Sequence, residues 1–390
     1  MMDTAGRHEF RVLAAAHPRL SVLLTAGRLV RRLRRVPRIG WVTADPLTAR
    51  RILNDPEHFS LLGEGGVGHL WAQVLGDWVY EIFDGPGHHQ LRARTRDLFT
   101  DESARRLTDR VIGARLARAG AELRGGGTVD VADLARVLVG RIVADLLQLA
   151  VVDRDESYRE IFATGEELAS LALGTTASTR LGPETVARAK AIVSRLTANV
   201  ADSWRSAPAE TVLGRCRELG LERRQAEGLA TLLMVAGTET AASAMARTVA
   251  ILHDTGAQHR LRGNPELLPD AVREGLRVTT PAPLIGRAVS ADVTVDGRWL
   301  RAGERVLMLT YTANNAAGGF DLDRGYQPDQ RQLWFGAGRH LCLGAPLARA
   351  EISGLLRTLL ETGRPWRIES RRYRRSVLIP SYASLPVRLA

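Results

Sequence analysis

One cysteine lies in a glycine-punctuated loop near the end of the chain. Residues 335–344 are Phe-Gly-Ala-Gly-Arg-His-Leu-Cys-Leu-Gly, and Ala345 and Pro346 then begin a run of good helix formers. We therefore expect the sulfur of Cys342 just before a helix N-terminus, where the helix dipole favours the thiolate. A thiolate can ligate a metal, and the neighbouring glycines permit the close approach of a flat, bulky ligand.

An acid and an alcohol stand side by side in a very apolar stretch. Residues 229–245 carry one ionisable side chain, Glu239, and Thr240 follows it directly. A helix this apolar is expected to be buried on all sides, so a carboxyl group within it needs a specific reason. A carboxyl next to a hydroxyl can pass protons to a bound reactant. One turn earlier, Ala236 and Gly237 leave room for a small ligand, and we expect a local widening of the helix there.

Two further pairs of side chains have helical spacing. A helix predicted to begin near Pro86 places His88 and Arg92 four residues apart, so both can reach one anion. Glu274 and Arg277, three residues apart, can form an ion pair on another predicted helix. Taken alone, each pair is more often part of a solvated helix face than of a site.

In this order and spacing, the motifs resemble those of the cytochrome P450 family, in which a cysteine thiolate ligates haem iron. The resemblance implies that Cys342 is the axial ligand of haem b. It also implies that Thr240 and Glu239 are catalytic and bring protons to bound dioxygen. Cofactor contacts are expected from His88, Arg92, Arg287 and His340 toward the propionates, from Phe335, Gly338 and Gly344 in the cysteine loop, and from Ala236 and Gly237.

The resemblance also assigns structural and substrate-facing positions. Glu274 and Arg277 are expected to pair with a third residue, Arg324, and so to lock the loop that carries the cysteine. The chain departs from the family here, because residues 313–324 form a shorter segment that lacks the usual Arg-Asp pair. Contacts with a lipophilic substrate are expected from Leu70, Val74, Met234, Leu284, Ile285 and Tyr382.

The pattern of the 390 residues predicts a mainly α-helical fold with small β-sheets, the cytochrome P450 fold, in a single large domain. We place that domain at residues 38–390, after an N-terminal helical segment at residues 1–37. Residues 61–82 are interpreted as a loop that either faces the substrate or only packs on the core.

Several local signals sharpen this fold. Asp45 and Pro46 predict a helix N-terminus, and Asp296 followed by Gly297 predicts a hairpin turn. The helices predicted at 162–173 and from Pro183 onward resemble the mobile lid pair of the family.

The chain is basic, with 54 Lys and Arg against 43 Asp and Glu, a formal net charge of +11. No aromatic interleaving or nucleic-acid motif accompanies the arginines, so nucleic acid is not an expected partner. A solvated, arginine-rich surface accounts for most of the excess. The rest suits a docking face for an acidic electron-donor protein, with Arg339 and Arg349 as candidates.

Cysteine content and hydropathy bear on location. The chain has two cysteines, Cys216 and Cys342, far apart in the sequence, so we expect no structural disulfide and a reducing, cytoplasmic setting. No uninterrupted apolar run is long enough to predict a membrane span.

The predicted activity is that of a bacterial haem monooxygenase. It would insert one oxygen atom of O2 into a C–H or C=C bond of a lipophilic small molecule, with electrons from ferredoxin and ferredoxin reductase. The alanine- and arginine-rich composition is typical of bacteria in which such enzymes tailor secondary metabolites. Two alternatives stay open: a peroxide-driven haem-thiolate peroxygenase, and a haem-thiolate sensor or binding protein without catalysis.

Overall fold

The computed structural model describes residues 3–30, 32–64, 66–173, 179–209 and 211–390. The α-helices of these residues are α1 Thr4–Ala16, α2 Pro18–Gly27, α3 Pro46–Leu53, α4 Val67–Leu75, α5 Trp78–Asp84, α6 Pro86–Thr95, α7 Asp101–Arg124, α8 Val131–Leu146, α9 Asp155–Leu173, α10 Pro183–Ser206, α11 Val212–Glu218, α12 Arg223–Asp254, α13 Ala257–Gly263, α14 Leu268–Thr279, α15 Thr310–Asn314 and α16 Ala345–Leu360. The strands are β1 Arg34–Val36, β2 Gly40–Thr43, β3 Phe59–Ser60, β4 Val129–Asp130, β5 Ile285–Val289, β6 Val293–Val295, β7 Arg298–Leu300, β8 Arg305–Met308, β9 Trp366–Ile368, β10 Arg372–Tyr373, β11 Tyr382–Ser384 and β12 Pro386–Leu389. The predicted mainly α-helical fold with small sheets is confirmed.

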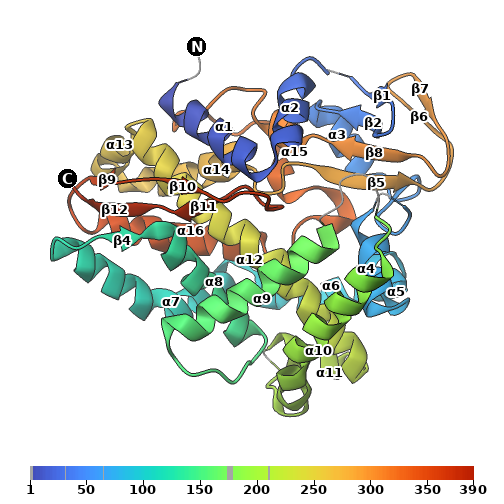
Figure 1. Ribbon diagram of the computed structural model, residues 1–390, viewed down its shortest axis with the longest axis horizontal. Helices are drawn as coiled ribbons and strands as arrows, with labels where there is room; N and C mark the ends of the chain where they lie inside the picture. The colour runs from blue at the N-terminus through green and yellow to red at the C-terminus, as the bar shows by residue number, and fades with distance from the viewer. Residues whose placement is uncertain (1–2, 31, 65, 174–178, 210) are drawn as a thin grey trace.

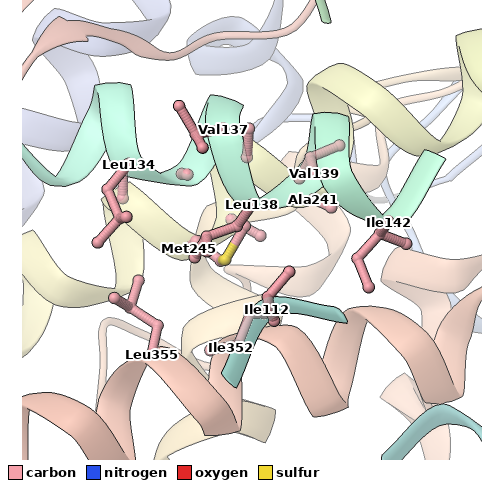
Figure 2. Close-up of a cluster of buried hydrophobic side chains, with 14 of the residues drawn as sticks. Ile112, Leu134, Val137, Leu138, Val139, Ile142, Ala241, Met245, Ile352 and Leu355 are labelled. Atoms are coloured by element: carbon pink, nitrogen blue, oxygen red, sulfur yellow. The ribbon is translucent and has the colours of Figure 1, made fainter. Parts of the chain in front are cut away.

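The long helix α12 runs through the middle of the molecule (Figure 1). A capping box between Glu222 and Gln225 begins it, and small residues allow close packing on several sides. Figure 2 shows the core where α12 meets α7, α8 and α16, with Met245 and Leu138 among the buried side chains. α12 is long and apolar enough to cross a membrane by composition, but 67% of its apolar window is buried inside the protein.

A five-stranded mixed sheet lies on one side of the molecule, and strands β9 to β12 lie on the other (Figure 1). The strand order of the five-stranded sheet is β1-β2-β8-β5-β3, with β2 and β8 parallel and the other neighbours antiparallel. Asp296 and Gly297 both have positive φ and form the tight turn of the β6–β7 hairpin, as predicted. This sheet positions Arg287, which lies on β5.

The N-terminal helices pack on the rest of the chain. Glu9 of α1 forms a fully buried ion pair with Arg247 of α12. The domain boundary proposed between residues 37 and 38 falls in the turn between β1 and β2, which pair with each other. The helical part of the N-terminal segment ends at Gly27, and the sheet begins before the boundary.

The interpretation of residues 61–82 as a loop is wrong, because α4 and most of α5 lie within it. A cluster of glycines ends at Gly68, and Leu70, Trp71 and Val74 then follow at helical spacing before Gly76 ends α4. They are buried in a cluster with residues of α9, α10 and α12. The predicted lid helices are present as α9 and α10, and residues 174–178 of the break between them lie outside the described residues.

Candidate functional site

The cysteine loop is a sequence of tight turns that ends on α16. Gly336 and Gly338 have φ of 78° and 67°, values that favour glycine. The amide of Cys342 donates to the carbonyl oxygen of Phe335 at 3.0 Å and closes the loop. Gly344 is the N-cap of α16, so the loop ends at a helix N-terminus as predicted.

Gly338 also allows a close contact within the protein, and its predicted contact with a flat ligand stays a prediction. A Cβ at this position would lie 2.4 Å from the carbonyl oxygen of Leu53 and 3.1 Å from a side-chain atom of Asn54. The glycine therefore lets the loop approach the C-terminal end of α3. At Gly344, by contrast, a Cβ would lie 3.9 Å from the sulfur of Cys342, which is ordinary contact.

The sulfur of Cys342 is exposed although protein surrounds it. Burial raises the pKa of the thiol, whereas amide hydrogen bonds from Gly344 and Ala345 and the charge of Arg92 lower it. A thiol that is both accessible and desolvated lies in a recess. The amide groups supply the stabilisation that a thiolate requires there.

Arg92 connects α6 to the cysteine loop. Its Nη2 donates to the carbonyl oxygen of Leu341, the residue before Cys342, at 2.7 Å. The guanidinium therefore helps to set the position of the loop and places positive charge near the sulfur. The predicted role of Arg92 toward a propionate stays a prediction.

Arg287 is a buried cation without a carboxylate partner among the described residues. Its side chain is 5% exposed, and its Nη1 donates to the carbonyl oxygen of Gly286 at 2.9 Å. Burial lowers the pKa of Arg287 to about 10, and the charge of Asp84 only partly opposes this effect. A desolvated guanidinium of this kind is stabilised by a bound anion.

Two histidines lie beside each other, His88 on α6 and His340 in the cysteine loop. The ring centroids of His88 and His340 are 4.9 Å apart. Burial and the nearby positive charges lower the pKa of His88 to about 4, and its Nδ1 is buried without a hydrogen-bond partner among the described residues. His88 is therefore a neutral ring with an unused polar atom.

Asp84 is a site residue that the sequence motifs missed. Its carboxylate contacts Nε2 of His340 at 3.0 Å and accepts a hydrogen bond from Ser60 at 2.7 Å, and Arg339 lies 3.7 Å away. Burial opposes ionisation of Asp84, but the hydrogen bonds from His340 and Ser60 hold its pKa below the usual value. Its position directly before the glycine and proline that begin α6 was the available signal.

One turn of α12 is open. Ala236 and Gly237 are exposed although the residues from Thr238 onward are mostly buried, and a Cβ on Gly237 would meet no atom within 4 Å. Thr240 donates its hydroxyl to the carbonyl oxygen of Ala236 at 2.8 Å. The expected widening is absent, since residues 223–254 form one uninterrupted α-helix.

Glu239 faces away from this opening, toward α9. Its side chain is 7% exposed. Burial, and then the charge of Glu166 on α9, raise the pKa of Glu239 to about 8. Among the described residues Glu239 makes no hydrogen bond with Thr240, whose hydroxyl is directed to the helix backbone. The two predicted catalytic side chains are neighbours in sequence that face different surroundings.

The predicted structural cluster is assembled. Arg277 binds Glu274 through two hydrogen bonds of 2.8 Å, and both side chains are almost fully buried. Nε of Arg324 lies 3.2 Å from the same carboxylate. Arg277 also donates to the carbonyl oxygens of Asn314 and Gly319, so it holds the first half of the shortened segment.

The predicted substrate contacts divide into two groups. Leu284 and Ile285, at the start of β5, are partly exposed. The other four are buried: Leu70, Val74, Met234 and Tyr382. Met234 packs against α9 near Gly165. A ligand would reach the buried side chains only after neighbouring groups move, and all six contacts stay predictions.

Comparison with known proteins gives a consistent result. The family model described as Cytochrome P450 matches residues 248–364, which include Cys342. Nocardicin C N-oxygenase of Nocardia uniformis subsp. tsuyamanensis is 31% identical over 324 residues, covering 78% of this chain and 77% of that protein. Putative cytochrome P450 YjiB of Bacillus subtilis strain 168 is 39% identical over 136 residues, covering 33% of this chain and only 34% of that protein.

Solved structures agree over a greater length. CalO2 superposes with a TM-score of 0.78 at 24% identity, covering 97% of each chain. HmtN, described as a post-tailoring hydroxylase of himastatin biosynthesis, superposes with a TM-score of 0.76 at 24% identity, covering 100% of each chain. The structural similarity therefore extends over nearly the whole chain.

Proposed function

Because this chain belongs to the cytochrome P450 family of haem-thiolate oxidoreductases, we propose that it is a monooxygenase acting on a lipophilic small molecule. It would insert one oxygen atom of O2 into a C–H or C=C bond. The observation that carries the proposal is Cys342, an accessible thiol at a helix N-terminus whose sulfur accepts two amide hydrogen bonds.

The side chains of this structure fit haem b. Cys342 offers one soft ligand in a recess, as a haem-thiolate centre requires. Among the described residues, Arg287 is a buried cation without a carboxylate partner and His88 has a ring nitrogen without a hydrogen-bond partner, so both could meet the propionates. Arg92 and His340 would complete the set, with Asp84 holding His340 in place.

When bound, the haem supplies the redox chemistry that activates dioxygen. The chain's own residues control the ligand and the protons. Gly344 and Ala345 stabilise the thiolate of Cys342 by amide hydrogen bonds. Thr240 offers a hydroxyl beside the open turn of α12, and Glu239 holds a proton at neutral pH. The carboxyl group of Glu239 and the hydroxyl of Thr240 favour a reaction that uses O2 over a reaction driven by peroxide.

We propose ferredoxin as the electron donor. A surface hollow of about 350 Å³ lies beside the cysteine loop, and Phe335, Arg273, Arg331 and Arg349 line it. An acidic partner suits this basic rim. Arg339 is a weaker docking candidate than the sequence indicated, because it is 20% exposed and turns toward Asp84 and His89.

The proposed substrate class follows from the relatives. Besides nocardicin C N-oxygenase, a matching protein is the 20-oxo-5-O-mycaminosyltylactone 23-monooxygenase of Streptomyces fradiae, 36% identical over 156 residues. We infer a role in tailoring a secondary metabolite, in the cytoplasm. The two cysteines are free, which suits a reducing compartment.

An optical titration followed by an isotope experiment tests this function. The purified ferric protein is titrated with macrolides, terpenoids, steroids, fatty acids and cyclic peptides, and a saturable shift of the haem band identifies a ligand. That ligand is then incubated with ferredoxin, its reductase and ¹⁸O2. One ¹⁸O atom in the product supports the proposal, whereas a tightly bound ligand recovered unchanged under full reduction would contradict it.

A further inference from the structure

Two acidic side chains meet where α9 crosses α12. Glu166 lies directly after Gly165, and Glu239 directly after Thr238. A Cβ on Gly165 would lie 2.9 Å from Oγ1 of Thr238, so only a glycine allows the two helices to approach this closely. The crossing therefore brings the carboxyl groups of Glu166 and Glu239 into contact.

The contact requires a proton. An ionised carboxylate only accepts hydrogen bonds, and Oε2 of Glu239 is buried without a partner among the described residues. With one proton on Glu239, the two carboxyl groups can share a hydrogen bond, and this bond contributes to the raised pKa of Glu239. Glu166 forms an ion pair with Arg374, whose Nη1 lies 2.6 Å from its carboxylate.

A small cavity adjoins the pair. Its volume of about 10 Å³ is at the lower limit for holding one water molecule, and its lining includes the polar side chains of Glu166, Glu239, Arg136, Ser243 and Tyr382 beside apolar ones. A water molecule there would find donors and acceptors on several sides. Glu239, whose Oε2 is buried without a hydrogen-bond partner among the described residues, is one of the residues that line this space.

The pair also leads to the surface. The side chain of Glu166 is 19% exposed and that of Arg374 is 28% exposed, whereas Glu239 is buried. The charged groups that face the pair come from each neighbouring element: Arg136 on α8, Glu166 on α9 and Arg374 after β10. Protons can enter at Glu166 and stop at Glu239.

We propose that Glu166 and Glu239 share one proton, and that Glu166, positioned by Arg374, reloads Glu239 from solvent through the single-water cavity. Glu239 gives up its proton to the reactant that the proposed function places at the open turn of α12. Glu166 then passes on a proton taken from water, so the pair returns to its starting state. Glu166 is a positioning and supply residue that touches neither substrate nor cofactor. The inference rests on the proposed function only for the destination of the proton.

Infrared spectroscopy of the resting protein tests the pair independently of turnover. The carboxylic acid band of Glu239 is isolated as the difference between the unsubstituted protein and Glu239→Gln, which cancels Glu351, another buried acid with a raised pKa. The band should be present at pH 7 and disappear near pH 8. In a Glu166→Gln background the midpoint should fall by about one pH unit or more, because the neighbouring negative charge is gone.

Glu167→Gln is the matched control, since Glu167 lies on the same helix but pairs with Arg188 on α10. It should leave the midpoint unchanged. An unchanged midpoint in Glu166→Gln, or no acid band at pH 7, would overturn the proposal. If a substrate is turned over, Glu166→Gln should slow product formation on the order of 100-fold, with partial rescue by Glu166→Asp. A protein without turnover but with the expected midpoints would contradict only the proposed function.

Discussion

At the scale of single residues, the site is distinguished by buried groups whose charge state is unusual. Arg287 is a buried cation that no carboxylate of the described residues pairs with, His88 is a neutral ring, and Glu239 is an acid protonated at pH 7. Desolvation is the largest cause of the pKa shift of each group. Such groups cost stability in the folded protein and are retained where binding or proton transfer uses them.

Replacement of Arg287 should affect haem binding and the stability of the haem-free protein differently. Arg287→Ala removes a desolvated cation, so the haem-free protein should be as stable as before or more stable. Haem retention should fall severalfold because a propionate loses its buried partner. Haem content per chain and the unfolding temperature are the measurements, with the exposed Arg298→Ala as control. Unchanged haem content in Arg287→Ala would exclude Arg287 from the anion site.

Glu239 should make stability depend on pH. Its pKa is about 8 in the folded protein against an ordinary 4.5, so the folded state binds the proton more tightly. Stability should therefore fall as the pH rises from about 4.5 to 8. Glu239→Gln removes this loss, so its unfolding temperature should exceed that of the unsubstituted protein by more at pH 8 than at pH 5. Equal differences at both pH values would contradict the raised pKa.

The residue types of the site could be predicted from the sequence because motif order restricts them strongly. Cys342 and its glycines lie in one short stretch, and so do His88 and Arg92. Asp84 could not be predicted, because its importance arises from contacts with Ser60 and His340, which are remote in sequence.

At the scale of secondary structure, buried ion pairs fix the segments around the cysteine loop. Glu274 and Arg277 on α14 hold Arg324 and the carbonyl oxygens of the shortened segment. The Glu274–Arg277 pair was visible in the sequence, but the further partners of Arg277 were not, since they are backbone carbonyl oxygens. The sequence also did not predict helices α4 and α5, which begin within residues 61–82. Neighbouring glycines favoured a loop there, and the short apolar helix α4 is stabilised by its tertiary packing.

Removal of Glu274 should be strongly destabilising. Glu274→Ala leaves Arg277 buried without its carboxylate, which typically costs about 3–5 kcal/mol in the free energy of unfolding. Urea unfolding of the purified protein is the measurement, and the exposed Glu266→Ala is the control. A loss below about 1 kcal/mol would mean that the backbone carbonyls alone satisfy Arg277.

At the scale of the whole molecule, α12 connects regions that are distant in sequence. It bears the open turn at Gly237, meets α9 at Glu239 and reaches α1 at Arg247. The pair of Arg247 with Glu9 is fully buried, and Arg247 also donates to the carbonyl oxygen of Pro380. The N-terminal helices are therefore fastened to the same core as the site.

Replacement of Glu9 tests whether the N-terminal segment is separate. Glu9→Ala should cost about 3–5 kcal/mol, because Arg247 stays buried without its partner. Unfolding should remain a single transition if α1 and the core melt together. The exposed Arg11→Ala serves as control. An early transition confined to part of the helical signal would instead identify residues 1–37 as an independent unit.

The central claim is that Cys342 binds haem iron as a thiolate, and the absorption spectrum of the reduced carbon monoxide complex tests it most directly. The unsubstituted protein and Cys216→Ser should both show the shifted band of a thiolate-ligated haem. Cys342→Ser should lose that band even if haem remains bound. A thiolate band that survives in Cys342→Ser, or one that is lost in Cys216→Ser, would contradict the account.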